Sequence, residues 1–154
     1  MSARTLARKA ARIALPAAAA IGIVASGGGA SAQTLSQDSN YYYGVASAGD
    51  CSVTSALAKA TQFGWQVSAW GYTGCNYAKS WITITTTLKA TNGVSSWTVG
   101  STQPYTTTGL RSAGWVQTLK FSCNPNLLYQ TVTQTNVSGI GAFYSTTGSP
   151  KRVC

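Results

Sequence analysis

The chain has 154 residues, of which eleven are Lys or Arg and two are Asp or Glu, and its formal net charge at pH 7 is +9. It contains no His, and charged residues make up only 8% of the chain. The lack of His excludes a Ser-His-Asp triad, and Asp38 and Asp50 are the only side-chain carboxylates in the sequence that could act in acid–base chemistry.

The N-terminal residues have the three parts of a secretory signal peptide. Arg4, Arg8, Lys9 and Arg12 make residues 4–12 positively charged, and residues 13–25 are mostly Ala, Ile, Leu and Val. Ala30-Ser31-Ala32 is an A-x-A cleavage pattern. The apolar segment is too short to span a bilayer as a stable anchor. We therefore predict that a signal peptide, residues 1–32, is cleaved before Gln33, and that residues 33–154 form one secreted, extracellular domain without a transmembrane anchor.

Residues 33–154 keep seven basic residues against the two Asp residues, a net charge of +5. The basic residues are spread singly along the sequence apart from the pair Lys151-Arg152. Nucleic-acid-binding proteins usually carry a clustered basic stripe instead. We expect no nucleic-acid partner, and only a mild, nonspecific attraction to anionic cell-wall polymers or lipid headgroups.

The composition of residues 33–154 is typical of β-strands, with many Thr, Ser, Tyr, Trp and Val residues and no Glu. Turn signals recur at the short intervals seen in all-β domains. We predict an all-β, single-domain antiparallel β-sandwich of about seven or eight strands, with immunoglobulin-like connectivity as one option.

The first predicted elements are a polar lead-in and a strand. Residues 33–43 begin polar, and order is expected from Tyr41–Tyr43 onward. Residues 52–62 fit both a helical stripe and strand alternation, and the surrounding sequence favours a strand.

Residues 65–72 are expected to form a strand with a change of phase. Trp70 and Tyr72 fall on the face opposite to the inferred core face. We predict a β-bulge at Gly71 where the phase changes. The residues inferred to face the core are Trp65, Val67 and Ala69.

Asn92-Gly93 predicts a tight hairpin, because both residues tolerate the positive φ that a type I′ turn needs. It would join strands over residues 80–91 and 94–101, with Thr91 opposite Val94. The alternation of apolar and polar residues gives the first strand one apolar face and one face exposed to solvent. The residues expected on the apolar side of this hairpin are Ile82, Ile84, Thr86, Leu88, Ala90, Ser95, Trp97 and Val99.

A second hairpin is predicted between residues 115–123 and 128–137, followed by a short strand over residues 142–146. In the second arm Tyr129, Thr131, Thr133 and Thr135 share one side. Such Thr-x-Thr tracts are typical of ordinary strands that face water, since Thr has a high β propensity. The residues of the first arm expected to point inward are Trp115, Leu119, Phe121 and Cys123.

Four cysteines lie after the predicted cleavage point, and an even number in an exported chain predicts two disulfides. A zinc site is excluded because no pair has C-x-x-C spacing and the chain has no His. Three connectivities are open. We favour Cys51–Cys75 and Cys123–Cys154, because sequential pairing suits neighbouring strands.

No residue pattern points to catalysis, a metal or a cofactor. Asp38 lies in the polar lead-in and Asp50 in a turn, so both carboxylates are expected to be solvated. Lys79 and Ser80 are adjacent, so in a strand their side chains would point to opposite faces. We therefore expect a protein that is not an enzyme.

Aromatic residues are the strongest candidates for a binding role, since the chain has five Trp and eight Tyr residues. Trp81, Trp70 and Tyr72 are the candidate ligand-binding residues, because exposed aromatic rings stack on sugars or insert at membrane interfaces. The Trp residues expected to pack in the core are Trp65, Trp97 and Trp115.

Phe121-Ser122-Cys123, the segment Tyr129–Thr133 and the closing Cys154, together with the N-terminal signal, resemble small exported proteins of high-GC Gram-positive bacteria. That resemblance covers about residues 113–154. It implies export, β structure and the Cys123–Cys154 pair, and it implies no catalytic or binding residue.

These features predict a secreted, non-catalytic binding or interaction protein that acts at the bacterial cell envelope or on extracellular glycan. Its partner would be a cell-wall polymer, a glycan or another envelope component. One alternative is a bacteriocin-like toxin or effector, which the positive charge and small size favour. Another is a surface structural protein that self-associates through poorly guarded strand edges.

Overall fold

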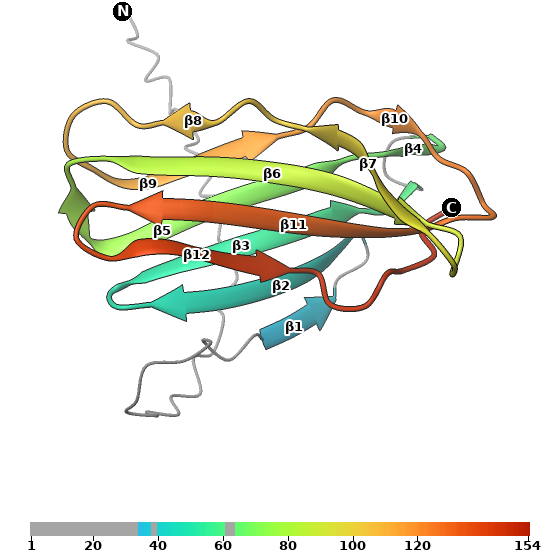
Figure 1. The fold of residues 1–154 in the computed structure, drawn as a ribbon, viewed down its shortest axis with the longest axis horizontal. Coiled ribbons are helices and arrows are strands. Elements are labelled where there is room, and N and C mark those ends of the chain that lie inside the picture. Colours follow the sequence, from blue (N-terminus) through green and yellow to red (C-terminus); the bar gives the residue numbers. More distant parts are fainter. Residues whose placement is uncertain (1–33, 38–39, 61–63) are drawn as a thin grey trace, which may run out of the picture.

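The computed structural model describes residues 34–37, 40–60 and 64–154 (Figure 1). The predicted signal peptide, residues 1–32, and its cleavage site lie outside the described residues. In the described residues the fold is all-β. Its strands are β1 (Thr34–Gln37), β2 (Tyr41–Ala48), β3 (Cys51–Ala58), β4 (Gln66–Val67), β5 (Ala69–Lys79), β6 (Ile82–Thr91), β7 (Ser96–Ser101), β8 (Tyr105–Thr106), β9 (Arg111–Gln117), β10 (Phe121–Ser122), β11 (Leu128–Val137) and β12 (Gly141–Thr146).

The strands form two antiparallel sheets that face each other, which confirms the predicted β-sandwich (Figure 1). The first sheet has the order β1-β2-β3-β5-β9, and the second has the order β12-β11-β6-β7 with β8 also paired to β6. The short strands β4 and β10 form a separate ribbon. The chain crosses from β5 to β6, returns to pair β9 with β5, and crosses again to pair β11 with β6. That alternation matches immunoglobulin-like connectivity, in which strands B and E pair in one sheet and strands C, F and G in the other.

The interior contains two apolar clusters, one toward each end of the sandwich. Strand β6 supplies both clusters, and its buried residues alternate as predicted from Ile82 to Ala90. One cluster is formed by Cys51, Ile82, Ile84, Val116 and Val137. The other is formed by Leu57, Val67, Ala69, Leu88, Ala90, Tyr129 and Val153.

A layer of buried hydroxyl groups lies between the two clusters. The Thr86 and Thr133 hydroxyl oxygens, on neighbouring strands of the second sheet, are 2.9 Å apart. The Ser55 hydroxyl crosses between the sheets, 2.7 Å from the Ser145 hydroxyl oxygen and accepting from the Thr133 backbone N–H at 3.0 Å. The Thr-x-Thr tract of β11 shares one side, as predicted, but that side faces the core rather than water. A Cβ on Gly71 would lie 1.9 Å from the Thr86 Oγ1 atom, so the sheets approach closely here because residue 71 has no side chain.

The first predicted hairpin forms, but its turn and register differ from the prediction. Thr91 pairs with Ser96 and Ala90 with Trp97, leaving a four-residue loop, and a bulge follows between Leu88 and Lys89. The side chain of Asn92 accepts hydrogen bonds from two backbone N–H groups inside the loop. Of the Asn-Gly pair only the glycine has a positive φ, 92°, so a type I′ turn does not form.

The second predicted hairpin is wrong. Strand β9 pairs with β5 of the first sheet, β10 pairs with β4, and β11 lies between β6 and β12 of the second sheet. The segment between β9 and β11 therefore changes sheet instead of turning back on itself.

The predicted phase of β9 is also wrong, because Gly114, Val116 and Thr118 face the core and Trp115 and Leu119 face out. The Ile84 side chain would lie 2.9 Å from a Cβ at Gly114, so the interior has no room there for an indole ring. None of the three Trp residues expected in the core is buried. Their exposed fractions are 67% for Trp65, 42% for Trp97 and 59% for Trp115.

Strand β5 begins after a break at Ser68, and no bulge occurs at Gly71. Its pairing with β3 is continuous from Leu57 opposite Ala69 to Cys51 opposite Cys75, and the irregularity lies beyond Gly74 on the β9 side. The strand alternative for residues 52–62 is confirmed for residues 52–58, which belong to β3.

Both predicted disulfides are present. Cys51–Cys75 joins two directly opposed residues of β3 and β5, and Cys123–Cys154 ties the C-terminal segment to the residue after β10. Two structural disulfides fit an oxidising environment. Across the part of the chain that the structure describes, no helix is long and apolar enough to cross a bilayer.

Candidate functional site

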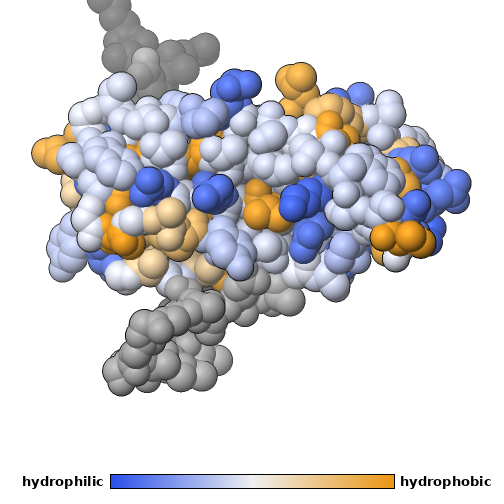
Figure 2. All heavy atoms as spheres, viewed as in Figure 1, coloured by the Kyte–Doolittle hydropathy of each residue, from blue (hydrophilic) through white to orange (hydrophobic). Residues whose placement is uncertain are grey.

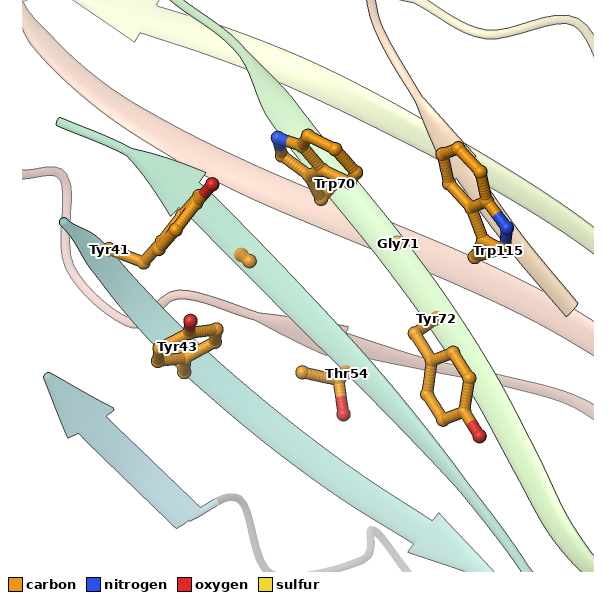
Figure 3. A pocket seen from close by; sticks show the side chains of 8 residues that line it. Tyr41, Tyr43, Thr54, Trp70, Gly71, Tyr72 and Trp115 are labelled. Atoms are coloured by element: carbon orange, nitrogen blue, oxygen red, sulfur yellow. The ribbon is translucent and has the colours of Figure 1, made fainter. Parts of the chain in front are cut away.

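A groove lined by aromatic side chains runs across the outer face of the first sheet (Figure 3). Its volume is about 340 Å³. Four strands contribute to it, because alternate residues of adjacent antiparallel strands lie side by side on one face. Its lining residues are Tyr41 and Tyr43 of β2, Thr54 and Ala56 of β3, Trp70, Gly71 and Tyr72 of β5, and Trp115 of β9.

The strand register explains the shape of the groove. Ala56 of β3 lies between Tyr43 of β2 and Trp70 of β5. One row further along, Thr54 lies opposite Tyr72, which in turn lies opposite Trp115. The small side chains of β3 therefore form the floor, and the larger aromatic side chains of its neighbours form the walls.

The two indole rings form one side of the groove. Trp70 and Trp115 stack with a centroid distance of 5.6 Å and an interplanar angle of 21° (Figure 3). Trp70 is half-buried, whereas Trp115 and Tyr72 are 59% and 46% exposed. On the other side, the rings of Tyr41 and Tyr43 lie 5.7 Å apart and are tilted by 37°. Apolar ring surface therefore remains accessible along the groove.

The indole N–H of Trp70 is the unusual polar group of the site. Its Nε1 atom is buried and has no hydrogen-bond partner among the described residues. Two other buried atoms share that property, Ser68 Oγ and Thr73 Oγ1, but neither residue lines the groove. A buried donor without a partner is unfavourable by about 1–3 kcal/mol, and an acceptor on a bound ligand would remove that cost.

The groove is uncharged. None of its eight described lining residues is Lys, Arg, Asp or Glu. Four of them carry a Tyr or Thr hydroxyl, which can both donate and accept hydrogen bonds. These groups suit a neutral ligand that has apolar faces and hydroxyl groups.

Asp50 lies outside the groove and makes an ion pair that links two parts of the first sheet. Its carboxylate accepts a hydrogen bond from Lys79 Nζ at 2.6 Å and another from the backbone N–H of Tyr77 at 3.2 Å. The Lys79 ammonium is the main cause that holds the pKa of Asp50 below its ordinary value. This ion pair joins the β2–β3 turn to the end of β5. No group of three or more metal-ligating side chains occurs among the described residues.

The structure brings together two of the three predicted ligand-binding residues. Trp70 and Tyr72 line the groove, as their shared face suggested. Trp81 does not, because it precedes β6 in the second sheet, where it is 39% exposed.

Sequence reasoning missed Trp115, Tyr41 and Tyr43 as groove residues. The i, i+2 spacing of the two Tyr residues was a signal for a shared face. For Trp115, the signal was that Gly114 and Val116, the residues on either side of it, could face the core, which would turn the Trp115 side chain outward. Comparison with protein-family models, with curated protein sequences and with solved structures gave no match for this chain.

Proposed function

We propose that the protein is a secreted, non-catalytic binding protein that takes a neutral glycan chain into the aromatic groove. The observation that carries the proposal is the buried, unpartnered Nε1–H of Trp70 in an uncharged groove walled by aromatic rings. The C–H faces of a sugar ring can pack on the exposed rings of Trp115 and Tyr72. A sugar hydroxyl or ring oxygen can accept the Trp70 hydrogen bond after a small rotation of the indole ring, because its Nε1 atom is buried in the free protein.

Secretion and action at the cell envelope belong to the same proposal. The N-terminal sequence pattern supports export, and the two disulfides fit an extracellular protein. An exported domain meets the glycans of the cell envelope, and a neutral glycan segment is the ligand that this groove suits. The groove needs no charged group to bind them.

Retention on insoluble glycans tests the proposal. Purified, oxidised protein is incubated with cellulose, chitin, β-glucan and peptidoglycan, and the bound fraction is measured after washing. We expect retention on at least one of them, and Trp115→Ala should lower the affinity about tenfold, because an aromatic stacking contact is worth about 0.5–1.5 kcal/mol beyond its buried area. Trp97→Ala is the matched control, since that residue is also partly exposed but belongs to the second sheet.

Trp70→Phe separates binding from folding. This variant keeps a ring but removes the unpartnered donor, so it should bind glycan more weakly while its unfolding free energy stays the same or rises. Equal retention of Trp115→Ala and the unchanged protein, or no retention on any of the four glycans, would overturn the proposed groove function.

A further inference from the structure

The recessed indole donor of Trp70 restricts the kind of ligand that can use the whole groove. Its Nε1 atom is buried and has no hydrogen-bond partner among the described residues. In Figure 3 this nitrogen lies on the edge of the indole that is turned toward Tyr41 and away from Trp115. The donor therefore belongs to the space between the two aromatic walls, below the exposed ring surfaces. Figure 2, which views the domain from the same side as Figure 1, shows mostly hydrophilic residues on that face of the molecule.

The floor beside this donor is small, apolar and fixed in position. Ala56 of β3 lies directly opposite Trp70, and it is only 7% exposed. Its carbonyl accepts a hydrogen bond from the Thr131 hydroxyl of the second sheet at 3.2 Å. At Gly71 the two sheets approach so closely that a Cβ would lie 1.9 Å from Thr86 Oγ1. The floor therefore cannot sink to make room, and a ligand group beside Trp70 must be small and must tolerate an apolar neighbour.

An acetamido substituent on a sugar ring fits these two requirements better than a hydroxyl group does. Its carbonyl oxygen is separated from the ring carbon by the amide nitrogen and carbon, so it extends further from the ring than a hydroxyl oxygen. Its methyl group is attached to the same carbonyl carbon, so one substituent can meet the Trp70 donor and the Ala56 side chain together. The Tyr and Thr hydroxyls that line the groove supply acceptors for the remaining amide N–H.

We propose that the groove selects glycans built from 2-acetamido sugars, the kind of sugar in chitin and in the glycan strands of peptidoglycan. This inference rests on the proposed glycan-binding function and names the class of sugar that the same site takes. The acetamido oxygen accepts the hydrogen bond of Trp70 Nε1–H after a small rotation of the indole ring, and the methyl group packs on Ala56. The sugar ring stacks on Trp115, which is exposed whatever the substituent is.

Two soluble trisaccharides of the same backbone test the selection with the purified, oxidised protein. Chitotriose and cellotriose are both β-1,4-linked and differ at C2 of each ring, where one has an acetamido group and the other a hydroxyl. Isothermal titration calorimetry measures the Kd of each. Chitotriose should bind about tenfold more tightly, because it satisfies the buried donor and adds a buried methyl group.

Matched variants separate this selection from general stacking on aromatic rings. Trp70→Phe keeps a ring but removes the donor, so it should lose most of the preference, chiefly through weaker binding of chitotriose. Trp115→Ala should weaken both trisaccharides alike and keep the preference, because stacking involves the sugar ring and not its C2 substituent. Ala56→Val raises the floor and should weaken chitotriose more than cellotriose. Trp97→Ala, in the second sheet, should bind both like the unchanged protein.

The indole N–H signals in a proton–nitrogen NMR spectrum give a direct readout at the donor. The Trp70 signal is the one that the Trp70→Phe variant lacks, and it should shift downfield with chitotriose and much less with cellotriose. Equal affinities for the two trisaccharides, or a Trp70→Phe variant that keeps the preference, would overturn this inference while glycan binding by the groove stands. Binding of neither trisaccharide, together with no retention on any insoluble glycan, would instead refute the proposed function, and the selection would fall with it.

Discussion

Replacing Thr86 or Thr133 by Val removes one hydroxyl group from the buried layer between the two sheets. Their Oγ1 atoms are 2.9 Å apart, and both residues have an exposed fraction of 0%. A single replacement leaves the remaining hydroxyl buried and without this partner. We therefore expect either single variant to lose about 1–3 kcal/mol of unfolding free energy.

The double variant Thr86→Val/Thr133→Val should lose much less than the sum of the two single losses. Both hydroxyls are then replaced by methyl groups of similar shape, and no buried polar group is left without its partner. The double-mutant cycle should give a coupling free energy of about 1–3 kcal/mol. Urea unfolding followed by Trp fluorescence, with the disulfides intact, measures all four proteins.

Thr87→Val is the internal control because Thr87 is the next residue of β6 but lies on the outer face, where its hydroxyl is 3.1 Å from that of Ser101. Its unfolding free energy should change by less than about 0.5 kcal/mol. If the losses at Thr86 and Thr133 simply add in the double variant, the two hydroxyls are not coupled and the proposed role of the buried layer is wrong.

Three further predictions follow from the same geometry. Gly71→Ala places a Cβ 1.9 Å from Thr86 Oγ1, so the sheets must separate beneath the groove. Thermal unfolding should show a loss of about 1–3 kcal/mol of unfolding free energy. Unchanged stability would contradict the close approach of the two sheets. Cys51→Ser/Cys75→Ser removes a disulfide between residues that are 24 positions apart in the sequence. Urea unfolding should show that the unfolding free energy falls by about 3–4 kcal/mol. A fall of less than about 1 kcal/mol would contradict this prediction. Because Lys79 lowers the pKa of folded Asp50, this carboxylate contributes stability above its unfolded pKa, about 3.9, and the contribution is lost as the pH falls through the folded pKa. Asp50→Asn should therefore flatten the decline of the thermal midpoint below about pH 4, and an unaltered decline would show that other groups cause it.

The strand content, the two-faced character of β6 and the disulfide pairs could be predicted from the sequence. Each depends on neighbouring residues or on simple spacing: alternation from Ile82 to Ala90 divides a strand into two faces wherever the strand lies. The same reasoning placed Trp70 and Tyr72 together on the face opposite Ala69, and the structure puts both in the groove.

Period-two alternation does not say which face of a strand meets the core, or which strand lies next to it. Trp115 is an example, since it faces outward because its neighbour Gly114 packs closely against the Ile84 side chain of the other sheet. The failed hairpin at residues 115–137 has the same origin, because the partner of β9 is β5, about forty residues earlier in the chain.

Sequence alone thus determined that the chain forms disulfide-linked amphipathic strands, because side-chain chemistry and local backbone preference act over a few residues. Only the tertiary structure decided that rings from β2, β5 and β9 share one groove. That arrangement arises from pairing and packing between distant segments, which depend on how side-chain volumes fit across two facing sheets.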